Sequence, residues 1–461
     1  MQEILEKQKK YFATKETYDV GFRILQLKRL KLQIMAYYPK ILSAFKQDLN
    51  KNEFDVVTTE IGPVMEEINY MIKHLKGLAK PQKKCASFMN IGAKGYIMHE
   101  PYGTVLIASP WNYPLQLSLL PLVGAIAGGN TIVLKPSRNT PNVTKVIEKI
   151  LNVFDSEYIF VVTKDEDIAE LFSSKFDLIF YTGSYKKAQE LLTAQANNLT
   201  PMILELGGKS PCFVDKDADV DLSAKKIVWA KFLNAGQTCV APDYVLVHSE
   251  IKEAFVEACK KWVATFYYSN DELNSDFVKV INKKALERLT GMIDINKTVF
   301  GGKVVGDKLE PTIMTDITYD DKCMQEEIFG PIMPILEFQD FEQEFAKVNE
   351  KAHPLAFYYF GMDKEKIYMV KNYGRFGGGC INDCIVHLLE TSLPFGGFGE
   401  SGMGAYHGKK SFYSFTREKS VLHRSKKMEL KTKFPPQTKG KLKIAKWYFG
   451  IKNLSQFNKN R

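Results

Sequence analysis

The chain has 461 residues, of which 45% are hydrophobic and 25% are charged. These proportions are ordinary for a globular protein and argue against a disordered or fibrous chain, and the length fits two or three domains. The net charge of +10 belongs to the C-terminus, because residues 426–461 hold eleven Lys or Arg and one acid, and the remaining residues are neutral in sum.

The ends and the cysteines exclude several further classes. Residues 1–7 are charged and lack an apolar run, so no secretory signal is expected. The longest apolar stretch, 115–126, is too short to span a bilayer. The seven cysteines form no Cys-x-x-Cys pair, which disfavours disulfide scaffolds and zinc ribbons. Cys380, Cys384 and His387 lack a clear complement of metal-binding partners, so we expect no metal. The absence of a disulfide pattern leads us to expect a protein of the reducing cytoplasm.

The predicted elements begin with helices and continue as alternating strands and helices. Residues 16–75 are expected to be helical, because apolar side chains recur at spacings of three and four. A Lys-rich stretch without clear periodicity, 80–94, precedes a short predicted strand, 96–100. The strands predicted after it are 104–108, 130–134, 158–162, 178–181 and 202–204, with helices at 115–127 and 143–154.

A second pattern of this kind begins near residue 210. Its predicted strands are 211–214, 244–247, 332–336 and 357–360, and residues 253–265 are predicted to be helical. The alternation predicts an α/β protein with parallel sheets that are covered on both faces. Ligands of such sheets bind beyond the carboxyl ends of the strands.

Two residues indicate covalent chemistry. Cys239 lies in a loop of small residues, and Glu205 lies in a glycine turn 34 positions before it. A thiolate can attack an electrophilic carbon, and a carboxylate can then activate water that releases the product. Taken alone, Cys239 is more simply a buried, inert cysteine and Glu205 a surface residue at a helix end. Together they suggest catalysis on a carbonyl.

Seven short motifs occur in an order that is typical of one family. They are Pro-Trp-Asn-Tyr-Pro (110–114), Lys-Pro-Ser (135–137), Tyr-Thr-Gly-Ser (181–184), Glu-Leu-Gly-Gly-Lys (205–209), Gly-Gln-Thr-Cys (236–239), Glu-Glu-Ile-Phe-Gly-Pro (326–331) and Leu-Pro-Phe-Gly-Gly (393–397). From about residue 15 to 420 the chain resembles the aldehyde dehydrogenase superfamily. The short N-terminal region and residues 237–244 are most similar to its class 3, fatty-aldehyde branch.

The resemblance implies an α/β fold with three parts. An open Rossmann-like domain that binds NAD(P) is expected at 1–80 and 101–207, and an α/β catalytic domain at 208–384. A small β oligomerisation arm is expected at 81–100 and 385–425, and the basic amphipathic tail at 426–461 follows. A homodimer is implied as well.

The resemblance also implies the catalytic roles. Cys239 matches the nucleophile, which forms a thiohemiacetal with the aldehyde and then a thioester. Glu205 matches the general base that activates the water for hydrolysis. Asn112 matches the oxyanion donor, acting with the backbone N–H of Cys239. An Asx turn before Pro114 is an ordinary use of Asn112 too, and the turn and the donor role are compatible.

The implied cofactor is NAD or NADP. Lys135 matches a residue that binds the adenosine ribose, while Gly183 and Ser184 open a helix toward the pyrophosphate. Glu327 and Phe329 match contacts to the nicotinamide ribose and ring. The remaining expected cofactor-binding residues lie in the same motifs: Pro110, Trp111, Ser137, Arg138, Leu206 and Gly207.

Two positions depart from the family pattern. Ala188 stands where the family often has a glycine, which affects how the pyrophosphate is held. Arg138 stands where the family usually has a glutamate that accepts a hydrogen bond from the adenosine 2′-hydroxyl. A guanidinium can pair with a 2′-phosphate, whereas a carboxylate repels it. We therefore expect NADP to be accepted at least as readily as by relatives with the glutamate, unless Arg138 points to solvent.

The tail has the pattern of a basic amphipathic helix. Ile444, Trp447, Tyr448, Ile451 and Leu454 share one face at helical spacing, with lysines around it. This pattern indicates binding of residues 430–461 to an anionic membrane surface. A solvated charge run or a helix packed on the body would show the same composition. Nucleic acid is not expected as a partner, because no fold motif accompanies the charge.

These observations predict the NAD(P)-dependent oxidation of a lipophilic aldehyde to its carboxylic acid. Medium- or long-chain aliphatic, aromatic and isoprenoid aldehydes all fit. The alternatives are a CoA-acylating aldehyde dehydrogenase and a non-catalytic binding relative. We expect a cytoplasmic enzyme that is peripheral on the inner membrane face if the tail binds lipid.

Overall fold

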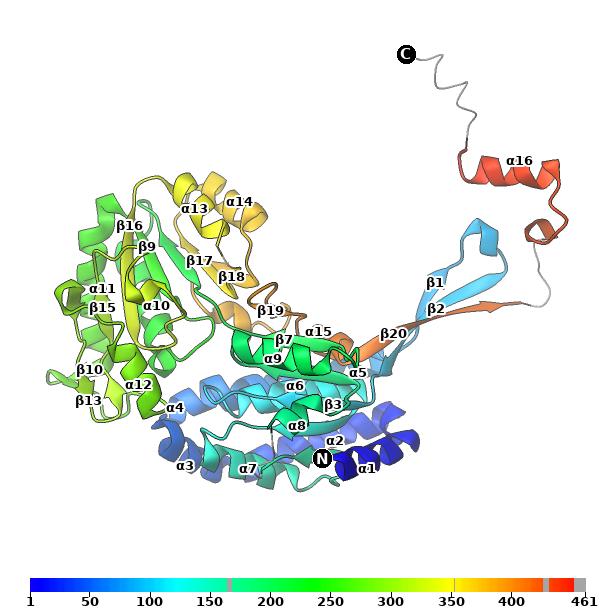
Figure 1. The fold of residues 1–461 in the computed structure, drawn as a ribbon, viewed down its shortest axis with the longest axis horizontal. Coiled ribbons are helices and arrows are strands. Elements are labelled where there is room, and N and C mark those ends of the chain that lie inside the picture. The colour runs from blue at the N-terminus through cyan, green and yellow to red at the C-terminus, as the bar shows by residue number, and fades with distance from the viewer. Residues whose placement is uncertain (164–167, 352, 426–430, 452–461) are drawn as a thin grey trace, which may run out of the picture. The chain divides into compact units, whose positions relative to one another are not determined.

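The structure, a computed structural model, describes residues 1–163, 168–351, 353–425 and 431–451 (Figure 1). They form two compact units. The first contains residues 1–78 and 100–417, and the second contains residues 79–99 with the chain from residue 418 onward. The domain bounds that the sequence suggests inside the first unit stay predictions.

The N-terminal part of the first unit is built on a six-stranded sheet. Its order is β19 (Gly402–Met403), β7 (Met202–Glu205), β6 (Leu178–Thr182), β3 (Thr104–Ala108), β4 (Thr131–Lys135) and β5 (Ile159–Val161). All neighbours are parallel except β19, which runs antiparallel to β7. The predicted strands in this region are confirmed to within two residues. They form because runs such as β3 and β4 are buried along their whole length.

Helices pack on both faces of this sheet. Helix α6 (Gln116–Gly128) is apolar all round because every one of its residues is buried. The others are α1 (Gln2–Ala13), α2 (Val20–Ala36), α3 (Tyr38–Leu49), α4 (Glu53–Val56), α5 (Gly62–Leu78), α7 (Pro141–Leu151), α8 (Ile168–Ser173) and α9 (Tyr185–Gln195). A π-helical turn, Val57–Ile61, joins α4 to α5.

A seven-stranded sheet forms the other half of the first unit. Its order is β12 (Thr298–Phe300), β15 (Thr312–Met314), β16 (Ile332–Phe338), β9 (Tyr244–His248), β8 (Pro211–Val214), β17 (Ala356–Phe360) and β18 (Gly378–Ile381). Its neighbours are parallel except for β12, which is antiparallel to β15. Strand β18 is absent from the sequence prediction, because its glycines resemble loop punctuation. A Cβ on Gly379 would lie 2.1 Å from the carbonyl oxygen of Phe357, so glycine permits this pairing.

The helices of this half are α10 (Val220–Phe232), α11 (Lys252–Tyr267), α12 (Lys283–Thr290), α13 (Phe341–Asn349) and α14 (Lys364–Tyr373). Helix α15 (Lys409–Ser414) packs instead on α6 and α5 of the N-terminal half. The prediction of a helix at 253–265 is confirmed by α11. Two short hairpins, β10–β11 (Tyr268–Ser269 and Glu272–Leu273) and β13–β14 (Val304–Val305 and Lys308–Leu309), complete it.

The second unit is a three-stranded sheet followed by the tail. The sheet order is β1 (Gln82–Cys85), β2 (Ala93–Pro101) and β20 (Thr416–Arg424). The predicted strand at 96–100 is therefore the end of a longer strand, and the Lys-rich stretch before it contains β1. In the tail, α16 (Lys439–Tyr448) is helical, as its periodicity predicts. No helix in the described part of the chain is long and apolar enough to cross a membrane.

Candidate active site

Cys239 lies where two cavities of the first unit meet. One cavity, of about 280 Å³, is lined by eleven of the fourteen residues that the sequence singles out: Pro110, Trp111, Asn112, Gly183, Ser184, Glu205, Leu206, Gly207, Cys239, Glu327 and Phe329. The other, of about 240 Å³, also reaches Cys239 and is mostly apolar. A thiol that borders two cavities can contact two ligands at once.

Of the other three expected site residues, Lys135 ends strand β4, and Ser137 and Arg138 follow it. In the sheet register Ala108 at the end of β3 pairs with Lys135 on one side and with Tyr181 on the other. Residues 135–138 therefore lie at the same sheet edge as the ends of β3 and β6. The Lys135 ammonium is buried and donates to the carbonyl oxygen of Pro136 at 2.8 Å. Ser137 accepts from the backbone N–H of Asn139, and Arg138 is exposed.

The nucleophile loop has an unusual backbone. Asn234, Ala235 and Gly236 have φ values of 53°, 53° and 69°, three consecutive residues in the left-handed region. A Cβ on Gly236 would lie 2.2 Å from the carbonyl oxygen of Gly330. The buried amide of Gln237 braces the turn, because it donates to the carbonyls of Asn234 and Lys279 at 3.1 and 3.0 Å. Asn234 and Gly236 suit this left-handed backbone, whereas Ala235 adopts it at a cost in strain.

The surroundings raise the pKa of both the Cys239 thiol and the Glu205 carboxyl group. Burial raises the pKa of the Cys239 thiol to about 12, with further contributions from the carboxylates of Glu327 and Glu205. Glu205 is 2% exposed, and neither carboxyl oxygen has a hydrogen-bond partner. Burial raises its pKa well above the usual value. A raised pKa makes the ionised carboxyl group a stronger base than an ordinary carboxylate.

Asn112 is tied to the nucleophile loop. Its side-chain amide nitrogen donates to the backbone carbonyl oxygen of Gln237 at 3.1 Å. Its backbone carbonyl oxygen accepts from the side-chain amide of Asn234 at 2.9 Å. An amide nitrogen carries two hydrogens, one of which serves Gln237. Asn112 therefore lies beside the peptide that precedes Thr238 and Cys239.

The segment that contains Glu327 is held by residues for which the sequence motifs suggest no role. The Lys209 ammonium pairs with Asp243 and donates to the carbonyls of Cys323 and Glu326, both at 2.9 Å. Arg288 donates to the carbonyl oxygens of Glu327 and Ile328 at 3.3 and 2.6 Å. Lys209 belongs to the Glu-Leu-Gly-Gly-Lys motif. No sequence motif includes Arg288, because its role arises from packing.

Glu327 and Phe329 enter the first of the two cavities at Cys239 from this segment. Burial, followed by the charge of Asp243, raises the pKa of Glu327 to about 8. A Cβ on Gly207 would lie 2.4 Å from the Glu327 carboxylate, which explains the glycine there. Phe329 has a φ of 47° and packs edge-to-face on Trp111 with ring centroids 5.5 Å apart.

Helix α9 opens toward the same cavity. Ser184 is its N-cap and accepts from the backbone N–H of Lys187 at 3.4 Å, and the N–H of Gly183 donates to the carbonyl oxygen of Glu205 at 3.1 Å. Ala188, one turn along, is buried in the core. A methyl group at this position therefore packs inward against the sheet.

The apolar cavity is made by segments far apart in the sequence. Its walls include Leu117, Trp229, Val240, Ile385, Leu388 and Phe395. Cys380 lines a different hollow, with its Sγ 3.5 Å from the Nδ1 of His387, and Cys384 is fully buried. Within the described ranges, no group of three His, Cys, Asp or Glu could hold a metal ion.

Comparison with known proteins agrees with this geometry. Residues 2–421 match the model of the aldehyde dehydrogenase family. The chain is 43% identical to 4,4'-diaponeurosporen-aldehyde dehydrogenase of Staphylococcus aureus, over 96% of this chain and 97% of that one. It is 36% identical to aldehyde dehydrogenase family 3 member A2 of Rattus norvegicus, over 100% of this chain and 96% of that one. It is 38% identical to the dimeric, NADP-preferring aldehyde dehydrogenase of Canis lupus familiaris, over 94% of this chain and 97% of that one.

Solved structures extend the match to the fold. A structure of Staphylococcus aureus AldH in a substrate-bound state superposes with a TM-score of 0.94 at 42% identity, covering 97% of this chain and 99% of that one. The protein belongs to the aldehyde dehydrogenase family, in which its full-length relatives include class 3 enzymes, and it is an aldehyde dehydrogenase.

Proposed function

We propose that the protein oxidises lipophilic aldehydes to carboxylic acids with NAD or NADP, using Cys239 as nucleophile. The observation that carries this proposal is the place of Cys239 at the junction of the two cavities. The apolar cavity suits a hydrocarbon chain whose carbonyl group reaches the thiol. The Staphylococcus aureus relative is named for an aldehyde, 4,4'-diaponeurosporen-aldehyde, which supports long, apolar substrates.

The residues perform the reaction in two stages. The Cys239 thiolate attacks the carbonyl carbon, and the developing oxyanion is stabilised by the Asn112 amide and the backbone N–H of Cys239. A bound NAD(P)⁺ would supply the hydride acceptor, and loss of the hydride leaves the carbon on Cys239 as a thioester. Glu205, in its ionised form, then takes a proton from water, whose oxygen attacks the thioester carbon and releases the acid and the Cys239 thiolate.

The cavity that contains Glu205 and Glu327 suits part of a dinucleotide. Its walls include Gly183 and Ser184 at the N-terminus of α9, where backbone N–H groups favour a phosphate. Gly207 lets the backbone approach closely there, because any side chain would meet Glu327. Lys135 would hold the adenosine ribose, and Glu327 and Phe329 the nicotinamide end.

The central test is an absorbance assay for NAD(P)H with aldehydes of increasing chain length. We expect activity that Cys239→Ser abolishes, with higher kcat/KM for long chains. Addition of CoA separates hydrolysis from the CoA-acylating alternative, because only the latter forms an acyl-CoA. A Cys239→Ser enzyme with wild-type activity would refute the proposed chemistry.

We also propose that Arg138 permits efficient use of NADP. It is exposed directly after β4, at the edge where the adenosine ribose is expected. The NADP-preferring relative from dog supports this assignment. In Arg138→Glu the ratio of kcat/KM for NADP to that for NAD should fall by about tenfold or more, since a charged hydrogen bond is replaced by repulsion. Lys283→Glu, in the exposed start of α12, should not change it. A strong NAD preference that Arg138→Glu leaves unchanged would contradict the idea.

For the tail we propose binding to an anionic membrane surface. In α16 and the residue after it, Ile444, Trp447 and Phe449 are all exposed, Trp447 by 75%, and lysines flank them. Deletion of residues 430–461 should abolish sedimentation with vesicles that contain phosphatidylserine and leave kcat for a short aldehyde unchanged. Equal sedimentation of both proteins would rule the tail out as the membrane contact.

We propose in addition that the enzyme is a homodimer. The relative from dog is named as dimeric, and it aligns with 94% of this chain. Sedimentation equilibrium of the tail-deleted enzyme, which removes any association through α16, should give twice the mass of one chain. A monomer that is fully active would contradict the proposal.

A further inference from the structure

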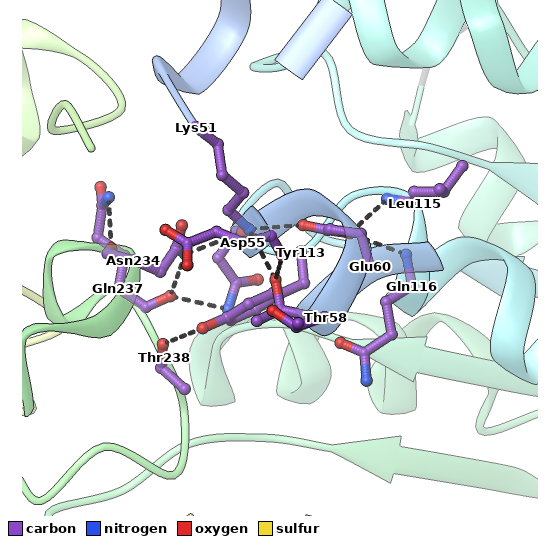
Figure 2. Close-up of polar contacts among 12 residues, drawn as sticks. Lys51, Asp55, Thr58, Glu60, Tyr113, Leu115, Gln116, Asn234, Gln237 and Thr238 are labelled. Atoms are coloured by element: carbon purple, nitrogen blue, oxygen red, sulfur yellow. Dashed lines mark hydrogen bonds and ion pairs between the residues drawn. The ribbon is translucent and has the colours of Figure 1, made fainter. Parts of the chain in front are cut away.

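A buried ion pair lies behind the catalytic loop and plays no part in the proposed chemistry. The Lys51 ammonium and the Glu60 carboxylate are 2.8 Å apart, with side chains that are 1% and 0% exposed (Figure 2). Glu60 belongs to the π-helical turn at 57–61, a kind of distortion that often marks functional sites. The desolvation of two buried charges offsets much of their Coulombic attraction. A contribution to stability is therefore not a sufficient reason for the presence of this pair.

Glu60 holds the start of helix α6. Its second carboxylate oxygen accepts from the backbone N–H groups of Leu115 and Gln116 at 3.2 and 3.0 Å. The first N–H groups of a helix have no partner within the helix, so this carboxylate replaces the missing acceptor. The two anchored peptides follow Asn112 by three and four residues.

Lys51 holds the neighbouring tyrosine. Its ammonium lies 4.3 Å from the centre of the Tyr113 ring, and the Tyr113 hydroxyl shares a 2.7 Å hydrogen bond with the hydroxyl of Thr238. Thr238 precedes Cys239 directly, and Asn112 precedes Tyr113. Figure 2 shows the Tyr113 hydroxyl directed at Thr238 and Lys51 beside Glu60. The ion pair is thus linked to the nucleophile through Tyr113, and to Asn112 through the start of α6.

We propose that Lys51 and Glu60 are positioning residues, which hold Asn112 and Cys239 in the relative placement that the oxyanion step needs. This inference rests on the roles proposed for Asn112 and Cys239. Neutralising the pair frees Tyr113 and the first peptides of α6. The thiol and the amide donor then both remain, but their geometry relaxes.

The test uses the full-length enzyme with Tyr113→Phe, Lys51→Met and the neutral pair Lys51→Met with Glu60→Gln. We expect kcat to fall by about 10- to 100-fold, the cost of a small misplacement, while KM for the aldehyde changes by less than about threefold. Lys51→Met combined with Tyr113→Phe should lower kcat little beyond the larger single effect, because both act through one link.

Lys366→Met is the matched control. It breaks another ion pair, Lys366 with the buried Asp215 at 2.6 Å, which lines neither cavity at Cys239. Its Tm should fall while kcat stays at the wild-type value. Unchanged kcat in Tyr113→Phe and in the neutral pair, or an equal loss of kcat in Lys366→Met, would overturn the inference. If Lys51→Met does not fold, Tyr113→Phe alone decides.

Failure of this inference differs from failure of the proposed function. An inactive Cys239→Ser alongside fully active Tyr113→Phe and neutral-pair variants would reject the positioning role and keep the chemistry. An active Cys239→Ser would reject both.

Discussion

The thiol of Cys239 should be unreactive in the enzyme without cofactor. Its pKa is raised to about 12 by burial and by the carboxylates of Glu327 and Glu205. At pH 8 a group with that pKa is thiolate in about one molecule in 10⁴, whereas an ordinary thiol of pKa about 8.5 is thiolate in about one in four. Alkylation at Cys239 should therefore be about 10³-fold slower than at a free thiol.

The assay is alkylation by iodoacetamide between pH 7 and pH 10, with each modified cysteine identified by mass spectrometry. The rate at Cys239 should rise about tenfold per pH unit without a plateau, because thiolate forms in proportion to hydroxide below the pKa. Exposed Cys85 in the same chain is an internal reference that should react first. A plateau for Cys239 below pH 9 would refute the reasoning.

A variant separates the charge from the burial. Glu327→Gln removes the neighbouring charge that raises the pKa of Cys239 most, so alkylation at pH 8 should accelerate, by about tenfold for each unit of pKa. Burial persists, and the rate should stay below that of an ordinary thiol. Glu326→Gln is the matched control, because that adjacent carboxylate pairs with Arg288 and contributes nothing to the Cys239 pKa. Equal rates in both variants would contradict the electrostatic explanation.

Three further changes test other parts of the site. Glu205→Gln should give a normal first turnover of NAD(P)H and then a steady state slower by about 10²- to 10⁴-fold, measured by stopped flow. Because burial raises the pKa of Glu205, the folded enzyme keeps a proton that the unfolded chain loses, and the stability of the wild-type enzyme falls as pH rises. The Tm of Glu205→Gln relative to wild type should therefore increase from pH 5 to pH 8. A Tm difference that is constant with pH would contradict this. Gly207→Ala should weaken binding of NAD(P)⁺ in a calorimetric titration, since the new methyl group would displace the Glu327 carboxylate; unchanged affinity would argue against that contact. Arg288→Met should raise KM for the cofactor more than KM for the aldehyde, because two carbonyls that hold the Glu327 segment lose their donor; equal changes would contradict it.

Local patterns were sufficient to predict the α/β architecture and the central strands of the two large sheets. Buried parallel strands need continuous apolar runs, and such runs are visible in sequence, as in 104–108 and 211–214. Strand β18 and the Lys-rich strand β1 are not predicted from apolar runs, because pairing with a neighbouring strand stabilises them more than their own side chains do.

The sequence by itself was sufficient to single out the residues around Cys239, because the turn before Cys239 and the close approach at Gly207 favour particular residues at fixed spacings. The Asn-Ala-Gly-Gln turn and the motif that begins at Glu205 are local requirements of this kind. Only the tertiary structure decided what surrounds them. The apolar cavity, the support of the Glu327 segment by Arg288 and the Lys51–Glu60 pair behind Tyr113 join residues tens to hundreds of positions apart. Burial there sets the pKa values of Cys239 and Glu205, and burial is a property of packing that no local pattern records.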